Sequence, residues 1–298
     1  MWRLSYSGHE ILVGPARVRP ELWRLAVGVV LIVGVSFFLS GLANTAMQAV
    51  APGLAASLEQ NGALGGSPAA LLILLGGFVF LTVATAAAVR LLHRRRLGSV
   101  LGPPRALVRD FLATAKGLAV LLAVLWLLPP WDMGAPLEPN LAPGLWLMML
   151  PLSLTAVLIQ TSAEEIVFRG YLQQQLAARF ASPWVWMLVP SALFAAGHYL
   201  PVEAGDNAIY IVLWAGLFGV LMADLTARAG NLGPAIAVHF ANNVSSLLIV
   251  SLPDMLNGLS LYTIDVDIAS REALVTIMPI DFVSMILMWL VARIAIRA

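Results

Sequence analysis

Long apolar runs recur along the chain and are separated by short connections that are polar or contain proline and glycine. Crossing about 30 Å of hydrocarbon takes about 20 helical residues. The pattern therefore predicts eight transmembrane helices, near residues 25–50, 69–92, 108–130, 143–178, 184–200, 207–227, 232–252 and 274–295. Turns are expected between them around residues 65–68, 129–130, 201 and 230–234.

The first 23 residues are more polar than the rest and contain several arginines. Pro15 and Pro20 interrupt any long helix there, and scattered apolar residues such as Leu12 and Val13 suggest a cytoplasmic segment that lies along the membrane surface. The first apolar run is too long for a signal-peptide core, so we interpret it as a retained span. Residues 24–298 are then a single transmembrane helical domain, without a soluble domain or an internal repeat.

Composition narrows the class of protein. The chain is 60% hydrophobic and only 11% charged, which leaves too little polar surface for an ordinary soluble domain. The formal net charge of +1 gives no reason to expect a nucleic-acid partner. Because cysteine is absent, thiol nucleophiles, disulfides and thiolate metal sites are excluded.

The arginines predict the orientation. They precede the first run, fill residues 90–109 between the second and third runs, and recur at Arg179, Arg228 and Arg293. The loops expected on the other side of the membrane hold mainly Asp and Glu, and Arg271 is their basic residue. Short cytoplasmic loops carry an excess of Lys and Arg. Both termini are therefore expected in the cytoplasm, which requires an even number of spans.

Three charged residues lie inside the fourth apolar run, where ionisable groups are costly and indicate function. On a helix, Glu165 and Arg169 are four residues apart and face each other, so they are expected to form a buried ion pair. Glu164 is rotated by about 100° and shares its face with Gln160 and Phe168. We interpret Glu165 and Arg169 as a structural pair, and Glu164 as a free carboxylate able to act as a general base.

Two further polar motifs lie in other spans: Phe194 with His198 in the fifth, and His239 with Asn243 in the seventh. Counting residues from the predicted turns places Glu164 and His198 at nearly the same depth, with His239 and Asn243 about 10 Å shallower. If helix tilt absorbs that difference, one polar cavity holds Glu164, His198, His239 and Asn243.

These residue types suit peptide hydrolysis without a covalent intermediate. A carboxylate and a histidine can deprotonate water, and a second histidine with an amide can donate hydrogen bonds to an oxyanion. In the alternative, Glu164, His198 and His239 bind Zn²⁺. We favour the metal-free route because H-E-x-x-H is absent and an asparagine is a poor zinc ligand. G-x-S-x-G is also absent, which disfavours a serine protease.

Two other classes of function remain open at this point. One is a non-catalytic immunity or binding scaffold that uses the same polar cavity to hold a peptide or lipid. The other is a proton-coupled transporter, which is disfavoured because no inverted repeats are visible. The three motifs together favour the enzyme.

The motifs E-E-x-x-x-R (Glu164, Glu165, Arg169), F-x-x-x-H (Phe194, His198) and H-x-x-x-N (His239, Asn243) resemble those of the CPBP family. This family of membrane proteins includes the Rce1-type CAAX prenyl endopeptidases and the bacterial Abi proteins. The resemblance covers about residues 145–250.

The resemblance implies an intramembrane glutamate endopeptidase of eight helices whose active site opens to the cytoplasm. In that scheme Glu164 and His198 activate water, His239 and Asn243 form the oxyanion site, and Glu165 and Arg169 orient the site. Phe194 is a supporting residue of the second motif.

The composition is rich in alanine and arginine and nearly free of lysine, as in a GC-rich bacterium. The expected location is therefore the inner membrane, where a prenylated CAAX substrate is not expected. The expected partners are the bilayer and a membrane-associated peptide or protein tail, such as a bacteriocin leader or a C-terminal sorting tail. No cofactor is expected, with zinc as the open alternative.

Overall fold

The computed structural model describes residues 6–60, 65–127, 136–253 and 255–297. The turn predicted at residues 129–130 lies outside the described residues. The N-terminal half contains α2 (His9–Val13), the 3₁₀ helix η1 (Gly14–Val18), α3 (Leu22–Val50), α4 (Pro52–Gln60), α5 (Pro68–Gly77), α6 (Val79–His93), α7 (Gly98–Leu101) and α8 (Pro104–Leu127).

The C-terminal half contains a long helix, residues 143–179, with a π segment near its C-terminal end. Its helices are α9 (Pro143–Glu165), the π-helix η2 (Ile166–Leu172), α10 (Gln173–Arg179), α11 (Pro183–Ala196), α12 (Pro201–Ala204), the 3₁₀ helix η3 (Gly205–Asn207), α13 (Ala208–Ala229), α14 (Gly233–Val244), the π-helix η4 (Ser245–Ile249) and α15 (Arg271–Ala295). Three short strands complete the fold: β1 (Leu137–Pro139), β2 (Val250–Ser251) and β3 (Tyr262–Ile264).

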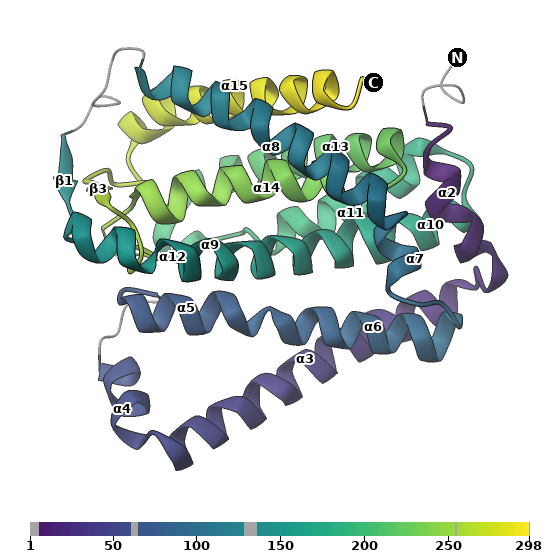
Figure 1. Ribbon diagram of the computed structural model, residues 1–298, viewed down its shortest axis with the longest axis horizontal. Coiled ribbons are helices and arrows are strands. Elements are labelled where there is room, and N and C mark those ends of the chain that lie inside the picture. Colours follow the sequence, from purple (N-terminus) through teal and green to yellow (C-terminus); the bar gives the residue numbers. More distant parts are fainter. Residues whose placement is uncertain (1–5, 61–64, 128–135, 254, 298) are drawn as a thin grey trace.

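The helices form three layers (Figure 1). Helices α9, α11, α13 and α14 make up the central layer, α8 and α15 lie on one side of it, and α3, α5 and α6 lie on the other. Helix α2, the junction of α6 with α7, and the C-terminal end of α15 all lie at one end of the bundle, whereas β1 and β3 lie at the opposite end. The arginine-rich connections of the sequence therefore share one end of the molecule.

Every predicted apolar run contains a helix. Five helices among the described residues are long and apolar enough to cross a membrane: Leu22–Val50, Pro68–His93, Pro143–Arg179, Pro201–Ala229 and Leu274–Ala295. Helices α11 and α14 have only 14 and 12 residues. The structure thus confirms a helical protein with several potential spans, and the number of eight stays a prediction.

The small sheet was not predicted. Strand β3 pairs antiparallel with β1 and parallel with β2, so the sheet order is β1-β3-β2. Each strand has three residues or fewer. Such segments are too short to show the alternation of polar and apolar positions by which a strand is recognised.

Local sequence signals explain where several helices start and stop. Proline occupies the first turn of α5, α9, α11, α12 and α14, where its missing N–H is not needed. The Ser67 side chain also accepts a hydrogen bond from the Ala70 N–H and caps α5. Helix α13 ends at Gly230, whose φ of +67° is the left-handed conformation that glycine adopts readily.

Gly219 permits the close approach of α13 to α11. A Cβ atom on Gly219 would lie 2.7 Å from Cβ of Ser191, whereas a Cβ on Gly216 would lie 3.6 Å from Cβ of Ala195. We expect Gly219→Ala to lower the thermal unfolding midpoint, because overpacking costs about 1–3 kcal/mol. Gly216→Ala is the matched control and should be neutral or slightly stabilising, since alanine favours helix by about 1 kcal/mol. Equal midpoints for the two variants in detergent would contradict this account.

One face of the N-terminal segment packs on the helical bundle. His9, Leu12 and Val13 are buried in the protein. The His9 ring lies 4.5 Å from the Trp186 ring of α11, and the Gln173 amide of α10 lies 3.3 Å from His9 Nε2. Leu12 and Val13 of α2 are therefore covered by the protein, while Ile11 is 53% exposed, and the position of the segment along the membrane surface stays a prediction.

Docking of this segment should depend on pH. Burial, followed by the charge of Arg17, lowers the pKa of His9 from 6.5 to about 3. In the undocked segment the pKa returns to its ordinary value, so protons bind preferentially to the undocked state. Docking is therefore fully stable above about pH 6.5 and weakens as the pH falls from 6.5 towards 3.

Hydrogen exchange of residues 8–18 measures this effect. Exchange should speed up between pH 7 and pH 5, after correction for the intrinsic rate, in wild-type protein. In His9→Gln, which keeps a polar side chain without a titrating group, the corrected rate should be independent of pH. The same pH dependence in both proteins would rule out His9 as the cause.

Candidate active site

The two adjacent glutamates have different surroundings. The Glu165 side chain is 0% exposed, and its Oε1 lies 3.0 Å from Nη1 of Arg169, which is 1% exposed. The pairing predicted from the four-residue spacing is present. The Glu164 side chain is 14% exposed and points to another face of the same helix. One carboxylate is therefore neutralised in the core, and the other stays accessible.

His239 lies between the two glutamates. Its Nδ1 is 2.8 Å from Glu165 Oε1, and its Nε2 is 3.5 Å from Glu164 Oε2. An ionised carboxylate only accepts hydrogen bonds, so Nδ1 is the protonated nitrogen that donates to Glu165. Arg169, Glu165, His239 and Glu164 thus form a continuous polar chain across α9, η2 and α14.

This contact corrects the expected depth of His239. Counting from the turns placed His239 about 10 Å shallower than Glu164, but the two side chains are neighbours. The reason is that the α13–α14 turn is not at the surface: residues 230–239 are all buried, and Gly8 and Gly102 pack against the turn. Helix α14 therefore begins deeper in the molecule than α11, whose preceding residues 181–182 are exposed.

Asn243 lies one turn after His239 and binds a residue that the motifs do not include. Its Nδ2 donates to Oε1 of Gln160, at 2.8 Å. Gln160 is buried and precedes Glu164 by one turn of α9. The sequence showed that Gln160 shares a face with Glu164, but its bond to Asn243 was missed. A glutamine in an apolar helix, four residues before a motif glutamate, was the available signal.

His198 follows the C-terminal end of α11 and is half-buried. Its Nδ1 lies 2.8 Å from the carbonyl oxygen of Phe194. A carbonyl only accepts hydrogen bonds, so Nδ1 bears the proton and, in the neutral ring, Nε2 has a free lone pair. In the described part of the chain no hydrogen bond joins His198 to Glu164. Their joint action on one water molecule stays a prediction.

Phe194 brings the two histidines into one cluster. Its ring centroid lies 4.4 Å from that of His198 and 6.0 Å from that of His239. Arg169 Cζ lies 4.8 Å above the same ring, a cation–π geometry. Phe218 of α13, which no motif contains, packs edge-on against His239 at 5.1 Å. The aromatic side chains fix the orientation of both imidazoles and shield the ion pair.

The ion pair retains unused hydrogen-bonding capacity. Within the described residues, Glu165 Oε2 and Arg169 Nη2 are buried without a hydrogen-bond partner. Leaving such a group unsatisfied costs about 1–3 kcal/mol, and a buried water is the usual partner for it. The interior of the site is therefore polar enough to accommodate water beside the glutamates.

The zinc alternative was tested on the same geometry. Across the described ranges, no three His, Asp or Glu side chains are grouped so that they could hold a metal ion together. His239 is instead engaged by a carboxylate at each ring nitrogen. The set Glu164, His198 and His239 does not fit a three-ligand zinc site in this arrangement.

Comparison with known proteins supports the motif analysis. A family model described as type II CAAX prenyl endopeptidase Rce1-like matches residues 144–245, a range that contains all three motifs. The resemblance is confirmed over these residues. Together with the apolar helices, the match indicates an integral membrane protein.

One curated relative is the uncharacterized protein YyaK of Bacillus subtilis (strain 168), which is 31% identical over 146 residues. The aligned region is 47% of each protein, so the chain spans about half the length of this relative. No solved structure matches the chain.

Proposed function

On the premise that residues 144–245 are Rce1-like, we propose that the protein is an intramembrane glutamate-type endopeptidase. It hydrolyses a peptide bond in a membrane-associated peptide or protein tail. The observation that supports this best is the position of His239, with Glu165 at Nδ1 and the accessible Glu164 at Nε2.

The first chemical step is activation of water. Glu164 accepts a proton from the water. The second O–H of the water donates a hydrogen bond to the unprotonated Nε2 of His198. The water oxygen bonds to the carbonyl carbon of the peptide, and an oxyanion forms. Phe194 holds His198 in the tautomer that this step needs, because its carbonyl binds the Nδ1 proton.

His239 and Asn243 stabilise the oxyanion. Nδ1–H of His239 stays hydrogen-bonded to Glu165, and its Nε2–H donates to the developing charge. Arg169 holds Glu165 in place through the ion pair. The C–N bond breaks when the proton on Glu164 passes to the leaving amine nitrogen, and the carboxylate is regenerated.

The proposal includes eight membrane-crossing helices, with both termini and the mouth of the site on the cytoplasmic side. The arginine-rich end of the bundle supports this orientation through the positive-inside rule. The proposed substrate is a bacterial peptide, leader or sorting tail. No step uses a metal ion, and elemental analysis of the active protein tests that directly.

A comparison of protein termini in cells tests the function. A deletion strain is complemented with wild-type protein, with Glu164→Gln or with Glu203→Gln, and the protein termini are identified by mass spectrometry. Glu203 is an exposed glutamate of α12 and serves as the matched control. A protease predicts termini that occur with wild-type and Glu203→Gln protein and disappear with Glu164→Gln.

The same experiment separates the enzyme from a binding scaffold. Termini that depend on the presence of the protein but are unchanged in Glu164→Gln would argue against hydrolysis at this site. If the Glu164→Gln protein also restored the wild-type growth and stress phenotypes, a non-catalytic scaffold would replace the present proposal.

A further inference from the structure

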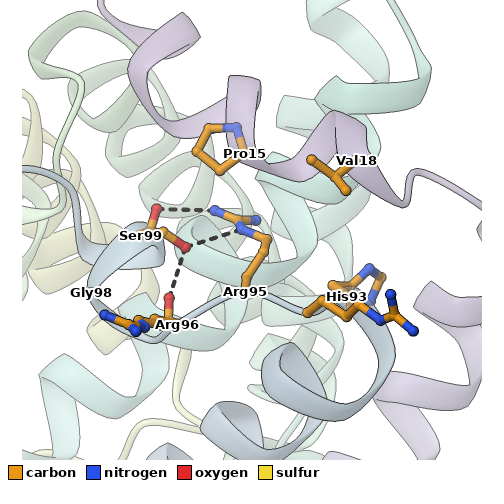
Figure 2. A pocket seen from close by; sticks show the side chains of 8 residues that line it. Pro15, Val18, His93, Arg95, Arg96, Gly98 and Ser99 are labelled. Carbon is orange, nitrogen blue, oxygen red and sulfur yellow. Dashed lines mark hydrogen bonds between the residues drawn. The ribbon is translucent and has the colours of Figure 1, made fainter.

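A second polar feature lies at the end of α6, on the side of the bundle where the arginine-rich connections gather. It is a cavity of about 430 Å³ whose lining includes Pro15, Val18, Arg94, Arg95, Arg96 and Ser99. Figure 2 shows the Arg95 guanidinium beside Ser99 and below Pro15. None of the residues of the candidate active site lines this cavity.

Arg95 is a buried arginine that lines the cavity. It is 4% exposed, and its Nη2 donates to the carbonyls of Leu12 and Ser99 and to Gln174 Oε1, at 3.2, 3.0 and 2.7 Å. Every one of these acceptors is neutral, and its Nη1 has no hydrogen-bond partner among the described residues. A buried cation without a compensating anion is costly.

The flanking arginines add two more charges. Arg94 and Arg96 are exposed on either side of the buried Arg95. The described residues contain no ion pair to any of these three arginines. Arg94 ends α6 with a φ of +55°, the left-handed conformation that a residue with a side chain seldom adopts. After this turn, all three consecutive arginines line the same cavity.

The position of the cavity indicates the ligand. The candidate span Pro68–His93 ends directly before Arg94, so we expect Arg94 at the level of the lipid headgroups. Guanidinium groups match phosphate oxygens in charge and in hydrogen-bond geometry. Pro15 and Val18 make the opposite wall apolar, as suits a phosphate that is esterified to a glycerol or acyl group.

We propose that Arg94, Arg95 and Arg96 form a binding site for a phosphate group, supplied by an anionic phospholipid or by a soluble phosphate ester. The bound phosphate compensates the charge of Arg95. Through Arg95 it also supports the contact of the α6–α7 connection with Leu12 of the N-terminal segment and with Gln174 of α10. This site is independent of the proposed peptidase activity.

Native mass spectrometry of the full-length protein in detergent tests the proposal. The protein is titrated with phosphatidylglycerol, with phosphatidylcholine and with glycerol 1-phosphate. Arg94→Gln/Arg96→Gln removes two exposed charges from the cavity and leaves the buried Arg95 in place. Each arginine near an anionic headgroup contributes about 5-fold in affinity, so the double variant should bind phosphatidylglycerol roughly 30-fold more weakly.

Arg105→Gln/Arg179→Gln is the matched control, because it removes two exposed arginines that do not line the cavity. Thermal unfolding of all three proteins confirms that they are folded. If the cavity variant selectively loses binding of phosphatidylglycerol, the ligand is a lipid. If it loses binding of glycerol 1-phosphate in the same way, the ligand is a soluble phosphate ester. Equal binding by wild-type protein and the cavity variant, or an equal loss in the control, would overturn the proposal.

Discussion

Glu164→Gln is expected to lower the rate of peptide cleavage by about 10³-fold while the protein remains folded. Glutamine has the shape of glutamate but cannot accept a proton, and general base catalysis contributes about 10²–10⁴-fold to rate. Folding should be little affected, because Glu164 is partly exposed and lies outside the ion pair of Glu165 with Arg169. The effect should therefore appear in the catalytic rate and not in stability.

The measurement uses a synthetic peptide that spans the cleaved tail found by the comparison of termini, reconstituted with purified protein in vesicles. Glu203→Gln should cleave at the wild-type rate. The thermal midpoint of Glu164→Gln should lie within about 2 °C of wild type, as expected for a change below about 1 kcal/mol. Cleavage by Glu164→Gln at more than a tenth of the wild-type rate would show that another group is the base.

Glu165→Gln is expected to lower stability more than any other single change in the site. It leaves Arg169 buried without a carboxylate, and breaking a buried ion pair by removing one partner costs about 3–5 kcal/mol. It also removes the acceptor that fixes Nδ1 of His239, at 2.8 Å. The thermal midpoint should fall by about 6 °C or more, and cleavage should be lost together with stability.

A double-mutant cycle isolates the ion pair. Arg169→Gln leaves Glu165 buried but still hydrogen-bonded by His239, so it should be destabilised less than Glu165→Gln. The variant with both substitutions should be more stable than Glu165→Gln alone, because no uncompensated charge remains. It should still be inactive, because Nδ1 of His239 has lost the Glu165 carboxylate that fixes it. Additive losses of stability in the double variant would mean that the two side chains do not interact.

Local geometry explains the parts of the site that were predicted correctly. The facing of Glu165 and Arg169 follows from helical periodicity, which depends only on a spacing of four residues. The separation of Glu164 from that pair follows in the same way. Both predictions hold because the helix is continuous from Pro143 to Arg179, with η2 as a π segment that keeps the pair in contact.

Predictions about which part of the molecule lies next to a given segment were less successful. The depth of His239 was counted from a turn that was assumed to lie at the surface, but α2 and the residues before α8 cover this turn. The apolar side chains of the N-terminal segment predicted contact with a membrane, but Leu12 and Val13 are buried inside the protein, and only others such as Ile11 and Val18 are exposed. A pattern of apolar residues shows that a surface is buried without showing what covers it.

The sequence by itself determined that this is a helical membrane protein, where its three polar motifs lie and which glutamate pairs with Arg169. Those properties depend on composition and on contacts within one helix. Only the tertiary structure decided that His239 joins both glutamates, that Gln160 holds Asn243 and that Arg95 is buried without an ion pair to any described residue. Each of these contacts joins segments more than 60 residues apart. Their formation depends on how the helices pack, and no local periodicity encodes that packing.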